Sequence, residues 1–167
     1  MDVQCDAARG HAHVGLHGAQ LRRQLLDQRR ELPVVGVAKT SGPGGVHVVA
    51  EHLPEAKYCG WPELVYGGLI AMLVDCHSNW TAMAYHYRAE GREPGSLPRI
   101  DCVTGNLGIK YIKPTPMGVP LTLRAHVEGE VGRKSRIICE VYAGDVLTCV
   151  GDSIFVRVDT AQLRDAA

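Results

Sequence analysis

The chain has 167 residues, a length that suits one domain with a hydrophobic core and is short for two. Its 18 basic and 18 acidic residues balance, whereas a nucleic-acid-binding protein usually carries a basic excess, so we expect no nucleic-acid partner. Nothing approaches the apolar length of a membrane span, and the N-terminus has no signal-peptide pattern, so no membrane partner is expected. The six cysteines form no close pair, which is typical of reduced thiols in a cytoplasmic protein.

Residues 1–45 have no clear pattern beyond a short amphipathic helix predicted over residues 19–30, which SGPGG at residues 41–45 separates from the rest. The histidines at positions 11, 13 and 17 are more typical of a mobile terminus than of a metal site. We therefore predict a flexible segment over residues 1–45, a folded domain over residues 46–158 and a tail over residues 159–167.

A strand is predicted over residues 46–53 and a long helix over residues 67–87. Along the helix, bulky side chains three or four residues apart form one stripe, and small residues around a single acid form a second row. We expect the bulky stripe to face the protein's own sheet and the small row to face a substrate or a partner subunit. The stripe consists of Leu69, Leu73, His77, Trp80, Ala84 and Tyr87, and the row of Ala71, Asp75, Ser78 and Ala82.

Four strands are predicted after the helix, over residues 101–113, 121–128, 135–142 and 146–158. The second alternates apolar and polar residues, the pattern of an antiparallel strand with one buried face. Turns are expected at residues 132–134 and 143–145, and Gly151 is predicted to mark a bulge. One long helix followed by successive antiparallel strands predicts an α+β fold with the sheet wrapped around the helix.

The segment VYGGLIAMLVD, residues 65–75, carries the chemistry. Gly67 and Gly68 have no Cβ, so the backbone can approach a ligand closely. The first amides of a helix lack an intrahelical partner and carry partial positive charge, which suits an oxyanion. Asp75, two turns further along, can act on the same carbonyl directly or through a water. This combination predicts hydrolysis of an acyl group.

The order of motifs resembles that of the hotdog-fold acyl-CoA thioesterases. VYGG is followed by a helix with Asp75, then by TGNLGIKYIKPTPMG at residues 104–118, a GRK hairpin and a terminal strand. Over residues 46–158 the chain is similar to PaaI-type thioesterases and to thioesterase superfamily members. The resemblance implies a hotdog fold and a thioester hydrolase that converts an acyl-CoA to a free acid and CoA, without a cofactor or a metal.

The resemblance also implies roles for particular residues. The Gly67 amide is the oxyanion donor, Asp75 is the general base or the nucleophile, and Thr104 orients the water or the acid. The residues implied in substrate binding are Tyr66, Gly68, Asn106, Lys110, Lys113, Arg133 and Lys134, of which the four basic ones are candidates for the CoA phosphates. Two positions depart from the family pattern: Tyr66 replaces a histidine, and Gly60 falls where some relatives have an asparagine.

Asp75, Cys76 and His77 do not form a catalytic chain, because consecutive helical side chains diverge by about 100°. We expect Cys76 to be a small buried apolar residue and His77 a hydrogen-bonded core histidine.

Two other functions stay open. One is a non-catalytic acyl-CoA-binding protein, in which Tyr66 would mark an altered site, although Asp75 and Thr104 argue against it. A hotdog hydratase or dehydratase would need a histidine ahead of the helix, and residues 58–66 contain none. The family's shared sites imply a homodimer or a dimer of dimers, and the acyl group stays undetermined.

Overall fold

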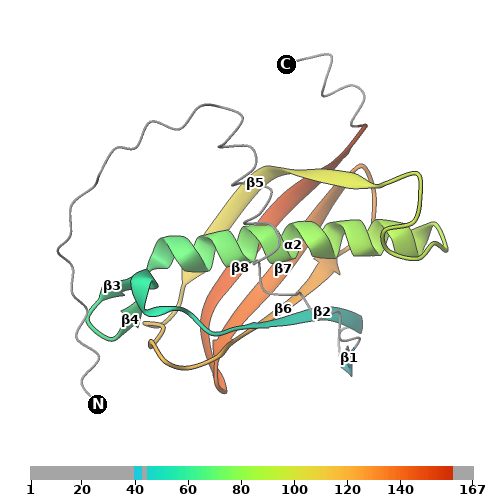
Figure 1. The fold of residues 1–167 in the computed structure, drawn as a ribbon. Coiled ribbons are helices and arrows are strands. Elements are labelled where there is room, and N and C mark those ends of the chain that lie inside the picture. Colours follow the sequence, from blue (N-terminus) through green and yellow to red (C-terminus); the bar gives the residue numbers. More distant parts are fainter. Residues whose placement is uncertain (1–39, 43–44, 160–167) are drawn as a thin grey trace, which may run out of the picture. The chain divides into compact units, whose positions relative to one another are not determined.

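A computed structural model describes residues 40–42 and 45–159 of the chain. The helix expected over residues 19–30, the three N-terminal histidines and all but the first residue of the tail lie outside this part. The proposed division into segment, domain and tail therefore stays a prediction. The described residues form one long helix and an antiparallel sheet (Figure 1), which confirms the predicted α+β arrangement.

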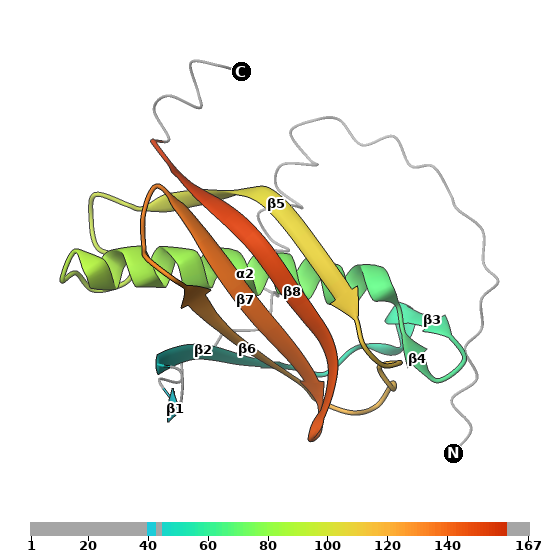
Figure 2. The same cartoon turned by 180° about the vertical axis from the view of Figure 1, so that it is seen from behind.

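The sheet has six strands in the order β1-β2-β6-β7-β8-β5, and every pair is antiparallel. In the sequence, the helix and β5 lie between β2 and β6, although β2 and β6 are neighbours in the sheet. β5 pairs with β8 and forms the edge of the sheet. Viewed from behind, the strands cross in front of the helix (Figure 2). The strands are β1 (Thr40–Gly42), β2 (Gly45–His52), β5 (Asp101–Tyr111), β6 (Leu121–Glu128), β7 (Lys134–Ala143) and β8 (Val146–Val158).

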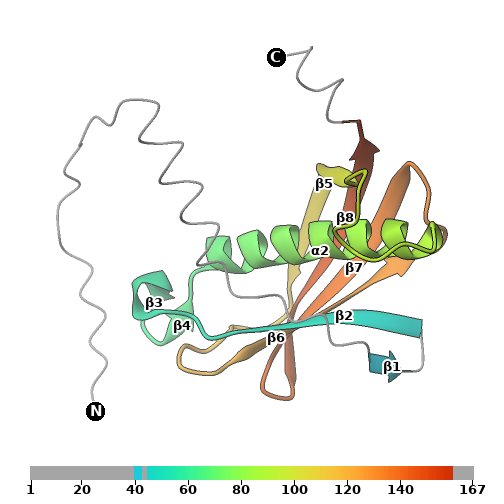
Figure 3. The same cartoon turned by 45° about the vertical axis from the view of Figure 1, so that its right-hand side comes forward.

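A small hairpin that the sequence did not predict leads into the helix. It consists of β3 (Cys59–Trp61) and β4 (Leu64–Val65), preceded by the 3-10 turn η1 (Ala56–Tyr58). These strands are too short for an alternating pattern to be read from the sequence. Figure 3 shows this hairpin at the N-terminal end of the helix, away from the strand β1.

Helix α2 runs from Gly67 to Ala89 and begins at the predicted residue. The prediction of which face packs on the sheet is only partly right: Leu69, His77 and Tyr87 of the bulky stripe are buried, but the rest of the prediction fails. Ser78 and Ala82, expected on the open face, are fully buried, whereas Trp80 is 52% exposed. The small side chains let the helix approach the sheet closely, and the exposed bulky ones, including Met72, lie on its outer side.

Gly151 accounts for this close approach. Its strand is in regular register there, with Ile109 on one side and Cys139 on the other, so the predicted bulge at Gly151 is wrong. A Cβ at this position would lie 2.3 Å from the Cγ1 atom of Val74, which is fully buried. The glycine is needed because the helix rests against the strand backbone. The bulges occur instead at Gly105 and at Thr148.

The core lies between α2 and the concave face of the sheet. It combines helix residues with inward-facing residues of β5, β6, β7 and β8, including Ile70, Leu123, Ile137, Val141 and Phe155. Cys76, Cys102, Cys139 and Cys149 carry free thiols, but Cys59 is disulfide-bonded, so the expectation of reduced thiols throughout is wrong at that residue.

The variant Gly151→Ala tests this packing. We expect it to lower the free energy of unfolding by about 1–3 kcal/mol, because the new methyl group overlaps Val74 in a core that cannot expand freely. Gly132→Ala is a matched control, since the nearest atom to a Cβ there is 3.9 Å away. Equal urea midpoints for the wild type and Gly151→Ala would contradict the close contact.

Candidate active site

The first turn of α2 provides two backbone donors. Tyr66 is the N-cap, and its carbonyl accepts the N–H of Leu69 at 3.0 Å and the N–H of Ile70 at 3.4 Å. The N–H groups of Gly67 and Gly68 precede these and have no acceptor inside the helix. Because they carry the partial positive charge of the helix N-terminus, this turn is suited to bind an oxyanion.

Two tyrosine rings lie against the glycine pair. Tyr111, at the end of β5, donates its hydroxyl to the Gly67 carbonyl at 2.7 Å. The Tyr66 ring lies over Gly68, where a Cβ would come within 2.3 Å of Tyr66 Cε1. A side chain at position 68 would therefore require the Tyr66 ring, which is 57% exposed, to move aside.

Gly60 belongs to the same arrangement. A Cβ at Gly60 would lie 2.9 Å from the Cα of Tyr66, because the β3–β4 hairpin brings the two backbones together. The N–H of Tyr66 donates to the carbonyl of Tyr58 at 2.7 Å and fixes this approach. A side chain at position 60 would therefore displace the backbone of Tyr66.

Asp75 and Thr104 meet between α2 and β5. Thr104 Oγ1 donates a hydrogen bond to Asp75 Oδ1 at 2.8 Å, which confirms that the two predicted residues are in contact. This bond engages one carboxylate oxygen, so Oδ2 can accept a hydrogen bond from a water or a substrate group. The pair is at the surface of the described chain, where a substrate can reach it.

The glycine turn and Asp75 are too far apart to act on one carbonyl within a single copy of the chain. They are eight residues apart on one helix, which corresponds to about 12 Å along its axis. A reacting carbonyl has to lie about 3 Å from both its oxyanion donor and the attacking group. Within one copy of the chain these two groups therefore do not act on the same carbonyl, which agrees with the family's expectation of a site shared between subunits.

The other predicted substrate-binding residues do not come together. The register of β5 with β8 places Asn106 and Lys110 on the outer face of the sheet, opposite to Thr104. Lys113 lies beyond the end of β5 next to Tyr111. Arg133 and Lys134 lie at the other end of the sheet, where the N–H of Arg157 donates to the Arg133 carbonyl. Position 110 is roughly 25 Å from this end at 3.3 Å per strand residue.

Cys76 and His77 have the structural roles expected of them. Burial raises the pKa of the Cys76 thiol, and the neighbouring Asp75 raises it further, so the thiol stays protonated and unreactive. His77 is buried and its Nε2 donates to the Val48 carbonyl at 3.0 Å. Burial lowers the pKa of His77, although the bond to Val48 opposes the shift, and the ring is neutral.

Tyr111 and Asn79 are further residues of this site that the sequence motifs did not predict. Asn79, one turn after Asp75, donates its Nδ2 to the Cys102 carbonyl at 3.1 Å and ties the helix to β5. In an unbroken strand, Thr104 and Tyr111 would point to opposite faces, because they are an odd number of residues apart. The bulge at Gly105 adds one residue and brings both to the helix side. A prediction of the bulge at Gly105 would have placed Tyr111 on the helix side of β5, beside the glycine turn.

The structure resembles solved thioesterases. A thioesterase superfamily protein from Shewanella loihica is 30% identical over 79% of this chain and 99% of its own, with a TM-score of 0.56. A Streptococcus mutans protein bound to acetyl CoA is 16% identical over 67% of this chain and 81% of its own, with a TM-score of 0.55. A Staphylococcus aureus acyl-CoA hydrolase in complex with butyryl coenzyme A is 17% identical over 68% of this chain and 63% of its own, with a TM-score of 0.55.

No protein-family model and no curated protein matches the sequence. The identity to the Shewanella loihica protein, over almost all of that protein, is sufficient to place the chain: it belongs to the thioesterase superfamily and has the hotdog fold. The resemblance inferred from the two sequence motifs is thus confirmed at the level of family and fold. No helix in the described part of the chain is both long and apolar enough to cross a membrane.

The contact between Tyr66 and Gly68 is tested by Gly68→Ala in two backgrounds. In the wild type we expect the variant to lower the free energy of unfolding by about 1 kcal/mol or more, because the new methyl group overlaps the Tyr66 ring. In a Tyr66→Ala background the same change should stabilise the helix by about 0.5–1 kcal/mol, the usual effect of replacing glycine by alanine. The same sign in both backgrounds, measured by urea unfolding, would contradict this arrangement.

Proposed function

We propose that the protein is an acyl-CoA thioesterase that hydrolyses an acyl-CoA thioester to a free acid and CoA. The observation that carries this proposal is the hydrogen bond from Thr104 to Asp75, which holds a carboxylate beside an accessible strand edge in a chain of the thioesterase superfamily. The proteins from Streptococcus mutans and Staphylococcus aureus, with the same fold, bind acetyl CoA and butyryl coenzyme A, which supports a CoA thioester as substrate.

In this proposal the thioester carbonyl binds with its oxygen at the Gly67 N–H of one copy. Asp75 of the other copy is then the general base that removes a proton from the attacking water. Alternatively, it is a nucleophile that forms an anhydride with the acyl group, which water then hydrolyses. In both routes the C–S bond breaks and CoA leaves as a thiolate that takes up a proton. Thr104 fixes the orientation of the carboxylate through its bond to Oδ1.

We propose that the active unit is a homodimer, alone or within a dimer of dimers. The distance along α2 between the glycine turn and Asp75 supports a site shared between two copies. Exposed apolar side chains that a partner would cover lie on α2, at Met72 and Trp80, and on the helix side of β5, at Leu107.

Substrate binding is proposed for the residues implied by the family resemblance. Tyr66 and Gly68 lie at the glycine turn, where the acyl group would approach. Asn106 and Lys110 lie on the outer face of β5, and Lys113 follows that strand. Arg133 and Lys134 lie at the opposite end of the sheet. The cytoplasmic location stays a prediction from the sequence.

A non-catalytic acyl-CoA-binding protein is the second candidate. One observation favours it: the Tyr66 ring lies over Gly68, beside the amide groups that would bind the oxyanion. In that case the protein would bind CoA esters without releasing a thiol.

Thiol release from acetyl-, medium-chain, long-chain and phenylacetyl-CoA tests the proposal. We expect the wild type to turn over at least one of these esters and Asp75→Asn to lower its kcat by about 100-fold or more, as for loss of a general base. Asp145→Asn, which changes an exposed acid in the β7–β8 turn, is the matched control and should retain full activity. Binding without turnover in the wild type would favour the second candidate, and an unimpaired Asp75→Asn enzyme would remove Asp75 from the mechanism.

A further inference from the structure

A cavity lies at the C-terminal end of α2, far from the glycine turn. It has a volume of about 1020 Å³, and its walls come from the last turn of α2, the loop before β5, the β6–β7 hairpin and the end of β8. Its helix residue His86 lies eleven residues beyond Asp75, or about 16 Å along the helix axis. The cavity is therefore separate from the contact between Asp75 and Thr104.

His86 presents a buried nitrogen without a partner in the wall of this cavity. Its side chain is 4% exposed, and its Nε2 has no hydrogen-bond partner among the residues that the structure describes. Buried polar atoms in proteins are generally hydrogen-bonded, so an exception beside a cavity points to a ligand. Burial lowers the pKa of His86 and the nearby Arg157 lowers it further, while Glu90 opposes the shift. The neutral ring can donate one N–H.

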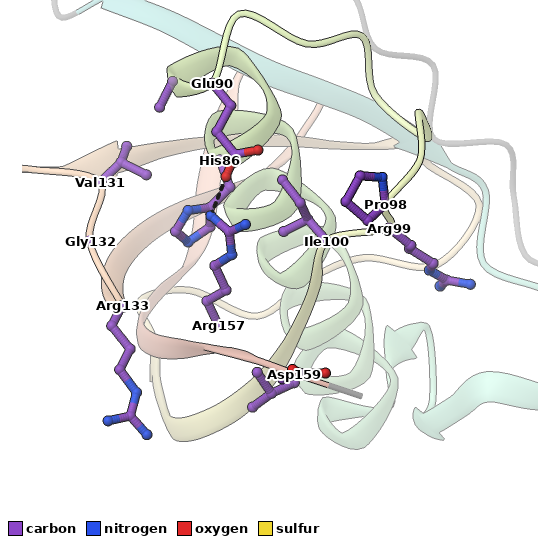
Figure 4. Close-up of a pocket in the computed structure, with 12 residues that line it drawn as sticks. His86, Glu90, Pro98, Arg99, Ile100, Val131, Gly132, Arg133, Arg157 and Asp159 are labelled. Atoms are coloured by element: carbon purple, nitrogen blue, oxygen red, sulfur yellow. Dashed lines mark ion pairs between the residues drawn. The ribbon is translucent and has the colours of Figure 1, made fainter. Parts of the chain in front are cut away.

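Three arginines that line the cavity come from different elements (Figure 4). In this view the Arg157 side chain is directed toward Glu90, and the exposed Arg133 side chain extends away from it, so Arg133 has to turn inward to contact a ligand beside Arg157. Arg157, at the end of β8, bonds Glu90 at 2.5 Å, and Glu90 also accepts Arg92 at 2.7 Å. One carboxylate is therefore shared by two guanidinium groups, which leaves one positive charge in excess. Arg133 extends from the hairpin and has no ion pair within the described part of the chain.

The remaining charged groups around His86 do not cancel this excess. Arg99, before β5, is paired with Asp101 at 2.8 Å, and Asp159 lies at the end of β8. The charged residues of the wall are three arginines and two acids, Arg99, Arg133, Arg157, Glu90 and Asp159, so the wall is net positive.

This combination suits a phosphate group. A guanidinium offers a planar pair of donors that matches two phosphate oxygens, and a charged hydrogen bond of this kind is among the strongest in proteins. The cavity is much larger than a phosphate ion, and Pro98, Ile100 and Val131 add apolar surface to its walls. The rest of a phosphorylated small molecule would therefore fit beside the charged groups.

We propose that this cavity binds a phosphate group of a phosphorylated small molecule, held by Arg157 and Arg133 and by a hydrogen bond from His86. The phosphate is carried either by a separate metabolite or by the CoA part of the substrate, and only the second source rests on the proposed function. Phosphate binding at this site is measured without thioester turnover. A protein that binds no phosphate can therefore still be a thioesterase, and a protein without thioesterase activity can still bind phosphate.

Calorimetric titration of the full-length protein with inorganic phosphate, at constant ionic strength, tests the site. We expect saturable binding that Arg133→Gln weakens about tenfold, the usual effect of losing one charged hydrogen bond. Arg133 makes no ion pair in the described chain, so this variant should fold normally. Arg124→Gln on β6 is the matched control, because its side chain lies on the outer face of the sheet and should leave binding unchanged. Absence of saturable binding, or equal binding by Arg133→Gln, would overturn the proposal.

A proton NMR titration of His86 provides an independent readout. Bound phosphate should raise the depressed pKa of His86, because an anion beside the ring stabilises its protonated form. Chloride at the same ionic strength should not raise this pKa. The His86 resonance is assigned by its absence from the spectrum of His86→Gln. An unchanged His86 titration at saturating phosphate would place the anion elsewhere and contradict the proposal.

Competition with CoA and with dephospho-CoA, which lacks the 3′-phosphate, identifies the source. If CoA displaces phosphate and dephospho-CoA does not, the cavity binds the 3′-phosphate of the substrate. If phosphate binds in the cavity and neither compound displaces it, the site serves a separate phosphorylated ligand. Both results support the cavity as a phosphate site.

Discussion

The contact between Val74 of α2 and Gly151 of β8 fixes how the helix lies on the sheet. With no Cβ on Gly151, the Val74 side chain rests against the strand backbone, and the row of small residues that includes Ser78 and Ala82 follows it into the core. Because Val74 faces the sheet, the next residue, Asp75, is turned by about 100° around the helix axis. That direction points along the sheet toward β5, where Thr104 bonds its carboxylate. The close packing and the orientation of the candidate catalytic acid thus have one cause.

The edge strand β5 carries the other half of this arrangement. Its bulge at Gly105 brings both Thr104 and Tyr111 to the helix side, one beside Asp75 and the other beside Gly67. These two contacts anchor β5 to the helix at points about two turns apart. One contact lies beside the proposed oxyanion donor and the other beside the proposed catalytic acid, so the two groups are held apart within one copy of the chain.

The sequence predicted what depends on local pattern and on motif spacing. The helix begins at Gly67 as expected, the long strands end within about two residues of their predicted bounds, and Asp75 and Thr104 meet. The packed face of the helix could not be predicted, because the bulky stripe and the small row are both compatible with burial. The buried face combines residues of both, and the close approach of the helix depends on Gly151, in a strand more than 70 residues further along.

The position of the basic residues depends on the same kind of non-local detail. Residue spacing alone gives no indication that Lys110 and Thr104 lie on opposite faces of β5, since an even spacing normally places two residues on one face. The Gly105 bulge reverses this parity. Likewise, Tyr66 and Gly60 are separate departures in the sequence, and only the β3–β4 hairpin makes them neighbours.

A site shared between two copies is tested most directly by mixing two inactive variants. Asp75→Asn lacks the acid, and Gly67→Pro lacks the backbone donor at the first helical position, where proline is tolerated. If the sites are shared, a refolded equal mixture should recover about a quarter of wild-type thioesterase activity, because half of the dimers are mixed and each has one intact site. A mixture as inactive as its two components, with mixed dimers shown to form, would contradict the account.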